Sequence, residues 1–352
     1  MAAIESLAAA DPQALARFDM IIDVRSPAEF AEDHVPGAVN LPVLSDAERA
    51  EVGTLYVQLS KFEARKLGAS YVARNVGAHL AGPLAKMEGG FQPLLYCWRG
   101  GMRSNAMAVV LAEVGWRVAV LKGGYKTYRA RVSRTLYDAP LGLQLVLLDG
   151  PTGSAKTEIL NRVAALGVQT IDLEGLAAHR GSLLGALPGQ PQPNQKLFES
   201  RLLAAIDGFD PARPVLVEAE SSKVGELMLP PALWSAMSAA PRIRIAAPAP
   251  ERVAYLLRAY ADTAADREGL DAMLSRLPVR LGRKRVDAWR ALARDGVFEE
   301  LAEELLSRHY DPSYARSSRS GARKPMEVIT LDRLDAAALA AAAHAVAERL
   351  TR

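Results

Sequence analysis

The only cysteine of the chain lies in a short motif whose residue types suit anion binding and thiol chemistry. Residues 97–104 read CWRGGMRS, so two glycines, two arginines and a serine follow Cys97 closely. The apolar stretch 93–96 predicts a strand and the stretch 104–114 predicts a helix, which places the cysteine in a strand-to-helix loop. Backbone N–H groups of such a loop bind an anion, and the same field lowers the pKa of a thiol.

We therefore predict a catalytic loop rather than a structural core cysteine, which would not need these neighbours. Arg103, at the start of the helix, adds a fixed charge that favours the thiolate and a planar set of donors. The predicted catalytic residues are Cys97 and Arg103, and the predicted anion loop is completed by Arg99, Gly100, Gly101 and Ser104.

A second glycine-rich motif, GPTGSAKT at residues 150–157, suits a diphosphate. It follows the P-loop pattern, in which backbone amides and a lysine cradle phosphate oxygens, except that Ala155 takes the second glycine position. That departure counts against ordinary nucleotide binding more than against phosphate binding. The apolar run 143–149 predicts a buried strand before the motif. The predicted diphosphate-binding residues are Gly150, Thr152, Gly153, Ser154, Lys156 and Thr157, of which Thr157 would reach a metal if one binds.

Acidic residues that could serve this second motif follow it in the chain. Residues 213–221, RPVLVEAES, predict another buried strand that ends in acids, near the place of a Walker-B carboxylate. An ordinary charge at a strand end is the alternative interpretation. The candidates for binding a metal or substrate are Glu218, Glu220 and Asp172, and the identity of any metal stays open.

Positive charge gathers in two segments although the net charge is only +3. Residues 276–294 hold seven Lys or Arg against one acid, and residues 308–324 hold five against one. Such clusters fit a phosphate backbone, with a solvated helix face as the alternative. We predict contacts with a nucleic-acid backbone at Arg283, Lys284, Arg285, Tyr310 and Arg316.

Composition and strand pattern predict a two-domain α/β protein. A chain of 352 residues exceeds one ordinary core, and strands alternate with helices as in parallel sheets. We predict a parallel-sheet domain over 1–137 and a second α/β domain over 138–352 that is mainly helical after about residue 250. The absence of a long apolar run and of a signal-peptide pattern at residues 1–13 predicts a cytoplasmic protein without membrane contact.

The first domain resembles a rhodanese domain. Residues 23–42, DVRSPAEFAEDHVPGAVNLP, are similar to the opening signature of that family, and LKGGY at 121–125 is similar to its closing segment. Five residues separate Cys97 from Arg103, one more than in the usual sulfurtransferase loop, and similar to the loops of cell-cycle dual-specificity phosphatases. A wider loop holds a tetrahedral oxyanion or a chalcogen larger than sulfur. A sulfurtransferase, a selenium carrier and a phosphatase therefore stay open for this domain alone.

The order of the two motifs, a rhodanese domain and then a P-loop domain, resembles the tRNA 2-selenouridine synthase family. The segments 171–185, 194–202, 217–225 and 309–317 agree with it, so that the resemblance spans nearly the whole chain. It implies that 2-thiouridine at the wobble position of tRNA is first alkylated by geranyl diphosphate and then converted to 2-selenouridine with selenophosphate. It implies no tightly bound cofactor, with Mg²⁺ as a further candidate ligand and the selenophosphate-producing enzyme as a candidate partner.

Two alternative functions belong to other classes of protein. A sulfurtransferase with a regulatory nucleotide-binding domain predicts persulfide turnover and tight binding of ATP or GTP, against which Ala155 argues. A phosphatase requires a general acid near the cysteine loop, for which Asp23 is the nearest candidate. A tRNA-binding scaffold without activity would have no use for two separate anion loops.

Overall fold

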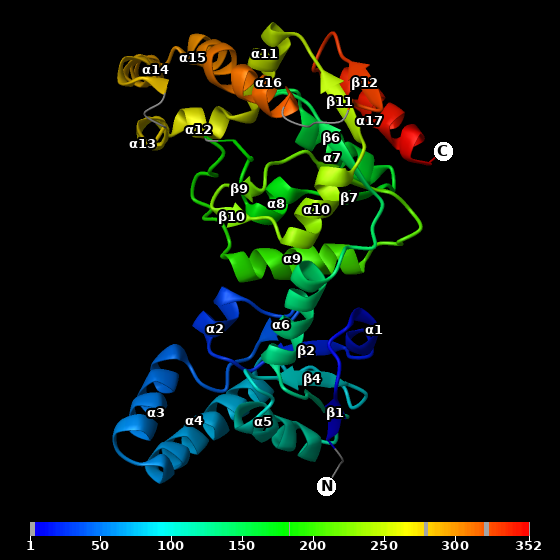
Figure 1. Ribbon diagram of the computed structural model, residues 1–352. Coiled ribbons are helices and arrows are strands. Elements are labelled where there is room, and N and C mark those ends of the chain that lie inside the picture. Colours follow the sequence, from blue (N-terminus) through cyan, green and yellow to red (C-terminus); the bar gives the residue numbers. More distant parts are fainter. Residues whose placement is uncertain (1–3, 183, 278–280, 320–323, 352) are drawn as a thin grey trace. The chain divides into compact units, whose positions relative to one another are not determined.

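The computed structural model describes residues 4–182, 184–277, 281–319 and 324–351, and the chain divides into two compact units (Figure 1). The first unit consists of Met1–Ala139 with Glu199–Asp207, and the second consists of Pro140–Phe198 with Gly208–Arg352. Each unit is built on its own parallel sheet of five strands. No helix among the described residues has both the length and the apolar composition of a membrane span.

The first unit has the strand order β1-β5-β4-β2-β3. Its strands are β1 (Glu5–Leu7), β2 (Met20–Asp23), β3 (Val39–Asn40), β4 (Pro93–Tyr96) and β5 (Ala119–Leu121). Its helices are α1 (Pro12–Leu15), α2 (Pro27–Glu32), α3 (Asp46–Gln58), α4 (Lys61–Ala81), α5 (Met102–Glu113) and α6 (Tyr125–Ser133), followed by the π-helix η1 (Arg134–Asp138). All four residues of β4 are buried, as a central parallel strand requires.

Local sequence explains where the charged helices of this unit begin. Ser45 and Ser60 accept hydrogen bonds from the backbone N–H groups of Glu48 and Glu63, so each serine caps the helix that follows it. The second of these helices, α4, ends at Ala81.

The second unit has the strand order β12-β11-β6-β8-β7. Its sheet strands are β6 (Leu145–Asp149), β7 (Gln169–Ile171), β8 (Val215–Glu218), β11 (Arg242–Ala246) and β12 (Glu327–Thr330), and a short hairpin is formed by β9 (Lys223–Val224) and β10 (Leu227–Met228). Among its helices are α7 (Lys156–Ala165), α8 (Leu173–Ala177), α10 (Pro231–Ala239) and α17 (Ala336–Thr351), while α9 (Gln195–Asp207) is shared between the two units.

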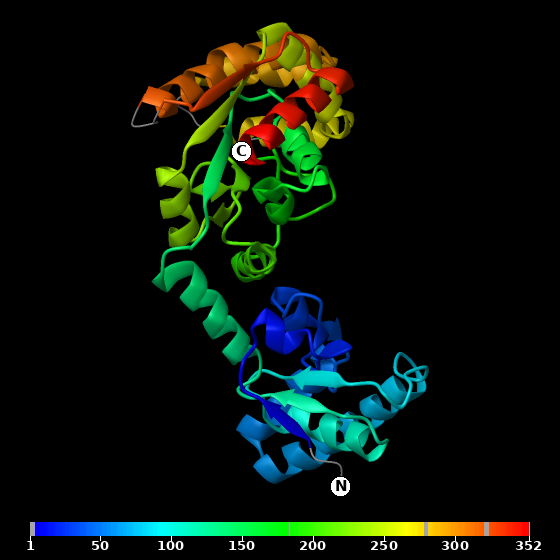
Figure 2. The same cartoon turned by 90° about the vertical axis from the view of Figure 1, so that its right-hand side faces the viewer.

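Both faces of this sheet are covered, which explains its continuous apolar strands. Ile159 of α7 and Val346 of α17 share one buried cluster with Leu148 and Ile245 of the sheet. The helix α10 lies on the opposite face (Figure 2). The alanine-rich end of the chain forms a helix, as the high helix propensity of alanine favours, and packs its apolar residues on the sheet.

The predicted helical character after residue 250 is confirmed, with one exception. The helices are α11 (Ala249–Ala259), α12 (Ala261–Ala265), α13 (Arg267–Ser275), α14 (Arg283–Asp295), α15 (Phe298–Leu305), the π-helix η3 (Leu306–Tyr310) and α16 (Asp311–Arg319). Leu274, Trp289 and Leu301 belong to their common core. The exception is β12, an edge strand whose residues alternate between partly buried and exposed and therefore lack the apolar run of a central strand.

Candidate functional site

The thiol of Cys97 lies at the base of the loop between β4 and α5. The Gly101 backbone N–H donates to Cys97 Sγ at 3.2 Å, and the Ser104 hydroxyl donates to the same atom at 3.3 Å. Burial raises the pKa of the thiol, but hydrogen bonds from Ser104 and from the amides of Arg99 and Gly101 outweigh it. The pKa of Cys97 therefore lies below its ordinary value. The loop favours a thiolate.

Two glycines let a second loop pack directly against this one. Gly100 and Gly124 have φ of 62° and 61°. A Cβ on Gly124 would lie 2.2 Å from the Cys97 carbonyl oxygen, and a Cβ on Gly100 would lie 2.6 Å from the Leu121 carbonyl oxygen. The Tyr125 N–H donates to the Cys97 carbonyl at 2.8 Å. The segment 121–125 thereby fixes the backbone of the cysteine loop.

The two arginines of the cysteine motif have different surroundings. Arg103 Nη1 donates to Glu29 Oε2 at 2.7 Å, and Arg49 pairs with the same carboxylate at 3.0 Å. Burial raises the pKa of Glu29, but its partner Arg103 and the nearby Arg49 lower it below the ordinary value. The structure thus pairs Arg103 with Glu29, a residue that the sequence analysis missed, whereas Ser104 and backbone amides stabilise the thiolate. Arg99 is exposed.

A buried ion pair and an aromatic group adjoin the cysteine loop. Arg25 Nη2 donates to Asp23 Oδ2 at 2.6 Å, and both residues are at most 1% exposed. The Arg25 guanidinium lies 4.2 Å from the ring centroid of Tyr125 and 5.9 Å from that of Trp98. The Trp98 and Tyr125 centroids are 5.2 Å apart. Asp23 is therefore engaged inside the fold, which disfavours it as the general acid of a phosphatase.

The second loop keeps the P-loop backbone although one glycine is replaced. Ala155 has φ 58° and ψ 30°, the left-handed conformation that glycine adopts without strain. Ala155 is buried and belongs to the same apolar cluster as Ile159 and Leu160 of α7. Gly153, with φ 81°, approaches the Arg252 carbonyl so closely that a Cβ would lie 3.0 Å from its oxygen. The alanine methyl group is thus accommodated in the loop at the cost of local strain.

The side chains at the start of α7 are held by neighbouring polar groups. Lys156 Nζ donates to the Gly150 carbonyl at 3.0 Å, across the loop. The Thr157 hydroxyl donates to Glu174 Oε2 at 2.8 Å. A fixed cation, two loop glycines and the N-terminus of a ten-residue helix together form an electropositive cradle suited to a diphosphate.

Carboxylates crowd together behind this cradle. The Glu174 N–H donates to Glu218 Oε2 at 3.2 Å, and Glu218 Oε1 is buried without a hydrogen-bond partner among the described residues. Burial, with the charge of Glu220, raises the pKa of Glu174 to about 7. Burial also raises the pKa of Glu220, and that of Glu218 to well above its ordinary value. Asp172 caps α8 by accepting from the Gly175 N–H at 2.7 Å.

A cavity of about 960 Å³ opens at the second loop. It is lined by all of the predicted diphosphate-binding residues, namely Gly150, Thr152, Gly153, Ser154, Lys156 and Thr157, and by Glu220. Glu218 and Asp172 lie outside its lining. The sequence analysis missed Glu174 and Arg180, which line it and belong to the segment 171–185. Tyr314 also lines it, and its hydroxyl donates to Asp149 at 3.1 Å.

The residues predicted to contact tRNA fall into two environments. Arg283, Lys284 and Arg285 are exposed in the first turn of α14, and none makes an ion pair with another described residue. Arg316 is exposed on α16. Tyr310 instead lines the P-loop cavity, so it lies with the diphosphate cradle. The segments 278–280 and 320–323 of the two basic clusters lie outside the described residues.

Together, the fold and the two loops define a rhodanese-like domain joined to a P-loop α/β domain. Residues 6–131 match the family model of the rhodanese-like domain, and residues 143–344 match that of the tRNA 2-selenouridine synthase AAA domain. The chain belongs to the tRNA 2-selenouridine synthase family.

Two relatives named tRNA 2-selenouridine synthase match most of the chain. The tRNA 2-selenouridine synthase of Shewanella loihica is 33% identical over 84% of this chain and 86% of its own length. That of Chromohalobacter salexigens is 35% identical over the same shares. A rhodanese-related protein of Thermoplasma volcanium, whose structure is solved, is 17% identical over 36% of this chain and 92% of its own, with a TM-score of 0.24.

Proposed function

We propose that the protein converts a 2-thiouridine of tRNA into 2-selenouridine in two steps, one at each anion loop. The observation that supports this proposal is the presence of two chemically different loops in one chain. One favours a thiolate, and the other presents a fixed cation and an open cavity. The proposal also rests on relatives that are named tRNA 2-selenouridine synthase.

The first step is S-alkylation at the P-loop. The thiocarbonyl sulfur of the wobble uridine attacks C1 of geranyl diphosphate, the C–S bond forms, and the C–O bond breaks. Diphosphate leaves with the electron pair, and the uridine loses its N3 proton. The task of the protein is to stabilise the leaving group, which loop amides and Lys156 Nζ are suited to do. The hydrogen bond of Lys156 to the Gly150 carbonyl would then be exchanged for one to the diphosphate.

The second step is selenium transfer at the cysteine loop. The Cys97 thiolate attacks the phosphorus of selenophosphate, so that an S–P bond forms and selenide leaves with the electron pair of the P–Se bond. Selenide adds at C2 of the alkylated base, and geranyl thiolate leaves. Water then cleaves the S–P bond and releases phosphate, so the step needs no oxidant or reductant. Exposed Arg99 is suited to orient the phosphoryl oxygens.

Mg²⁺ would fit the P-loop cavity with the diphosphate. No cluster of three His, Cys, Asp or Glu side chains suited to a metal ion occurs among the described residues. Mg²⁺ in P-loop proteins needs only one or two protein oxygens beside phosphate and water oxygens. The Thr157 hydroxyl and the Glu174 carboxylate supply such oxygens, and the unpartnered Oε1 of Glu218 lies behind them. A bound ion would neutralise charge on the diphosphate.

The tRNA would be held by the exposed cations of α14 and α16. Arg283, Lys284 and Arg285 repel one another and the positive end of the helix dipole, a cost that a bound phosphate backbone would offset. We place the reaction in the cytoplasm, where tRNA and a selenophosphate-producing partner enzyme would meet it.

Nucleoside mass spectrometry of tRNA tests the proposal. The comparison is between selenium-fed cells with the gene, without it, and without it but complemented by the intact gene. We expect 2-selenouridine to disappear on deletion, 2-thiouridine to rise by the same amount, and complementation to restore both. An unchanged nucleoside profile after deletion would overturn the proposal.

A further inference from the structure

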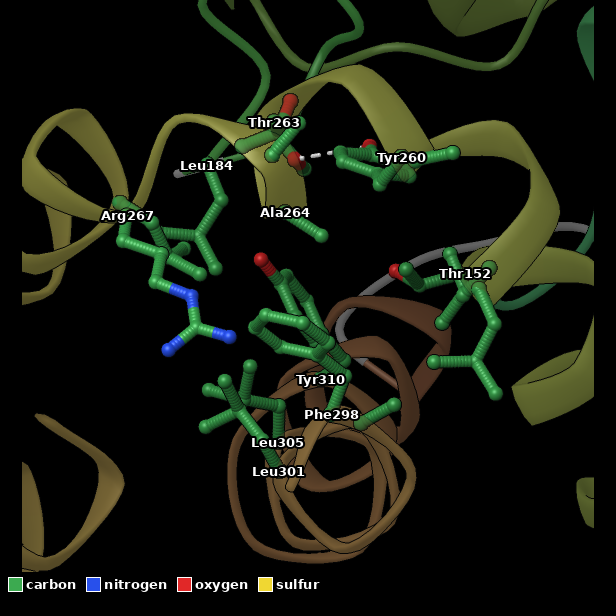
Figure 3. Close-up of a pocket in the computed structure, with 17 residues that line it drawn as sticks. Thr152, Leu184, Tyr260, Thr263, Ala264, Arg267, Phe298, Leu301, Leu305 and Tyr310 are labelled. Carbon is green, nitrogen blue, oxygen red and sulfur yellow. Dashed lines mark hydrogen bonds between the residues drawn. The ribbon is translucent and has the colours of Figure 1, made fainter. Parts of the chain in front are cut away.

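A second cavity, of about 530 Å³, lies in the helical part of the second unit (Figure 3). Residues of α12, α13, α15 and η3 line most of it. Its lining is dominated by leucine, alanine and aromatic side chains. The labelled side chains of Leu301, Leu305 and Phe298 rise from α15 toward Ala264 on the opposite wall (Figure 3).

This apolar pocket joins the P-loop cavity. Five residues line both, namely Thr152, Ser182, Leu256, Tyr260 and Tyr310. Thr152 belongs to the P-loop itself, so the mouth of the apolar pocket lies where the diphosphate cradle ends. A ligand with an anionic head in the cradle would direct its remaining atoms into this pocket.

The polar groups at the mouth are already paired with one another. The Tyr260 and Ser182 hydroxyl oxygens are 3.2 Å apart, and the Arg180 guanidinium stacks 4.8 Å from the Tyr260 ring centroid. Thr263 Oγ1 accepts from Arg180 Nη1 at 3.0 Å. Arg267, the one charged residue among the described lining, donates to the Arg294 carbonyl at 2.9 Å. A nucleobase, which needs partners for its donors and acceptors, would gain little here, whereas a hydrocarbon loses nothing.

We propose that this pocket holds the hydrocarbon chain of a prenyl diphosphate whose diphosphate lies in the P-loop, and that its far end sets the chain length accepted. The proposal rests on the proposed function, since it adds the tail site to the alkylation step. Residues that line only the apolar pocket lie beyond the five shared residues, among them Ala264, Phe298, Leu301 and Ala302. Two of them are alanines, whose replacement by a larger side chain would shorten the pocket.

The test compares prenyl donors of three lengths, dimethylallyl, geranyl and farnesyl diphosphate, in transfer to 2-thiouridine tRNA by the full chain. Each buried methylene contributes about fourfold in affinity, so the intact protein should prefer geranyl over dimethylallyl diphosphate by about a hundredfold or more in kcat/KM. Ala264→Phe and Ala302→Phe should lower kcat/KM for geranyl diphosphate at least tenfold. They should leave the value for the dimethylallyl donor and the inhibition constant of inorganic diphosphate unchanged.

Two further variants distinguish a blocked pocket from a protein that has failed to fold. Phe298→Ala enlarges the pocket and should raise the relative use of farnesyl diphosphate about tenfold, which an unfolded protein cannot do. Glu303→Phe changes the neighbouring exposed residue on α15, which does not line this pocket, and should leave the chain-length preference as it is.

The outcomes separate this inference from the proposed function. Geranyl transfer that is indifferent to all three pocket variants overturns the tail site and leaves the proposed function intact. An intact protein that binds geranyl diphosphate no more tightly than inorganic diphosphate, measured by calorimetry without tRNA, also overturns the tail site. Tight, pocket-dependent binding without transfer to tRNA supports the tail site and overturns the alkylation step.

Discussion

The cysteine loop and the P-loop share one local architecture and differ in what they do with negative charge. Each follows a buried parallel strand, β4 or β6, and each opens a helix, α5 or α7. In the first, amides and Ser104 point at a sulfur atom of the chain and stabilise its thiolate form. In the second, the protein supplies a cation and leaves room for an incoming anion.

The backbones of the two loops also differ in the space that they leave for a side chain at a residue with positive φ. Gly100 has positive φ where the Leu121 carbonyl leaves no space for a side chain. Ala155 has nearly the same φ, yet its methyl group is tolerated in a buried position. Both loops pack closely against other segments, the cysteine loop at Gly100 and the P-loop at Gly153, but position 155 of the P-loop leaves space for a methyl group. Similar strand-to-helix turns can thus hold a reactive group of the protein or a substrate.

The largest expected effect is that of Cys97→Ala, which should separate alkylation from selenium transfer. Cys97→Ala should abolish selenium transfer, because no other cysteine exists in the chain. Alkylation should continue, since Lys156 and the P-loop amides are unchanged, and geranylated 2-thiouridine should accumulate. The measurement is nucleoside analysis after incubation of purified protein with 2-thiouridine tRNA, geranyl diphosphate and selenophosphate. Failure of Cys97→Ala to alkylate would reverse the assignment of steps to loops.

The reciprocal change is Lys156→Ala. It removes the fixed charge that meets the leaving diphosphate, and loss of one such contact costs on the order of a hundredfold or more in rate. Alkylation should fall by that factor, leaving plain 2-thiouridine. The same variant should still convert geranylated tRNA supplied from outside, which is the control for folding and for the cysteine loop. Full alkylation by this variant would contradict the role of the P-loop.

A smaller effect, on the free energy of unfolding, should distinguish position 100 of the cysteine loop from position 155 of the P-loop. Gly100→Ala places a Cβ 2.6 Å from the Leu121 carbonyl oxygen at positive φ, and should lower the free energy of unfolding by about 2 kcal/mol or more. Ala155→Gly should change it by less than about 1 kcal/mol, because relief of strain is offset by the added freedom of the unfolded chain. Urea unfolding measures both. Gly90→Ala is the matched control, because among the described residues only the chain neighbours of Gly90 come within 4 Å of the added Cβ. Equal losses at positions 100 and 90 would refute the packing argument.

The last effect depends on pH and concerns the carboxylates behind the P-loop. The pKa of Glu174 is about 7 in the folded protein, above the usual 4.5. The folded state therefore binds a proton more readily than the unfolded chain, and ionisation of Glu174 lowers stability as pH rises from about 4.5 to about 7. Glu174→Gln should remove this slope, so that the intact protein loses stability relative to the variant across that window.

Thermal unfolding at several pH values, with the exposed residue changed in Glu268→Gln as control, checks the prediction. A difference between the intact protein and Glu174→Gln that is independent of pH would show that the raised pKa plays no part in stability.

The sequence predicts those helices and strands whose residues form a recognisable local pattern. The strands before both loops and the helices after them follow from apolar runs and glycines that lie close together in the chain. Contacts between residues far apart in the sequence could not be predicted from such local signals. The ion pair of Arg103 with Glu29 joins residues 74 positions apart, and no local pattern selects that carboxylate. The strand β12 was missed because an edge strand shows no continuous apolar run.

The same reason explains the placement of Tyr310 and Glu174. The basic residues near Tyr310 predict a contact with nucleic acid, but the π-helix η3 places Tyr310 in the lining of the cavity. Glu174 belongs to a segment that already pointed to the family, yet only the fold brings it within 2.8 Å of the Thr157 hydroxyl. Residue types indicated what kinds of chemistry the chain contains, and the sheet order decided which of them meet.

The aromatic group beside the thiol has an optical consequence. Trp98 follows Cys97 directly in the chain, and its ring lies close to Tyr125 and to the Arg25 guanidinium. Indole emission depends on nearby charge and on quenching by neighbouring groups, so a change of charge state at the thiol or an oxyanion entering the loop should alter the intensity or wavelength of Trp98 fluorescence. The chain has four tryptophans, and Trp98 alone belongs to the cysteine motif. Occupancy of the cysteine loop can thus be followed in real time without a label, by subtracting the emission of a Trp98→Phe protein.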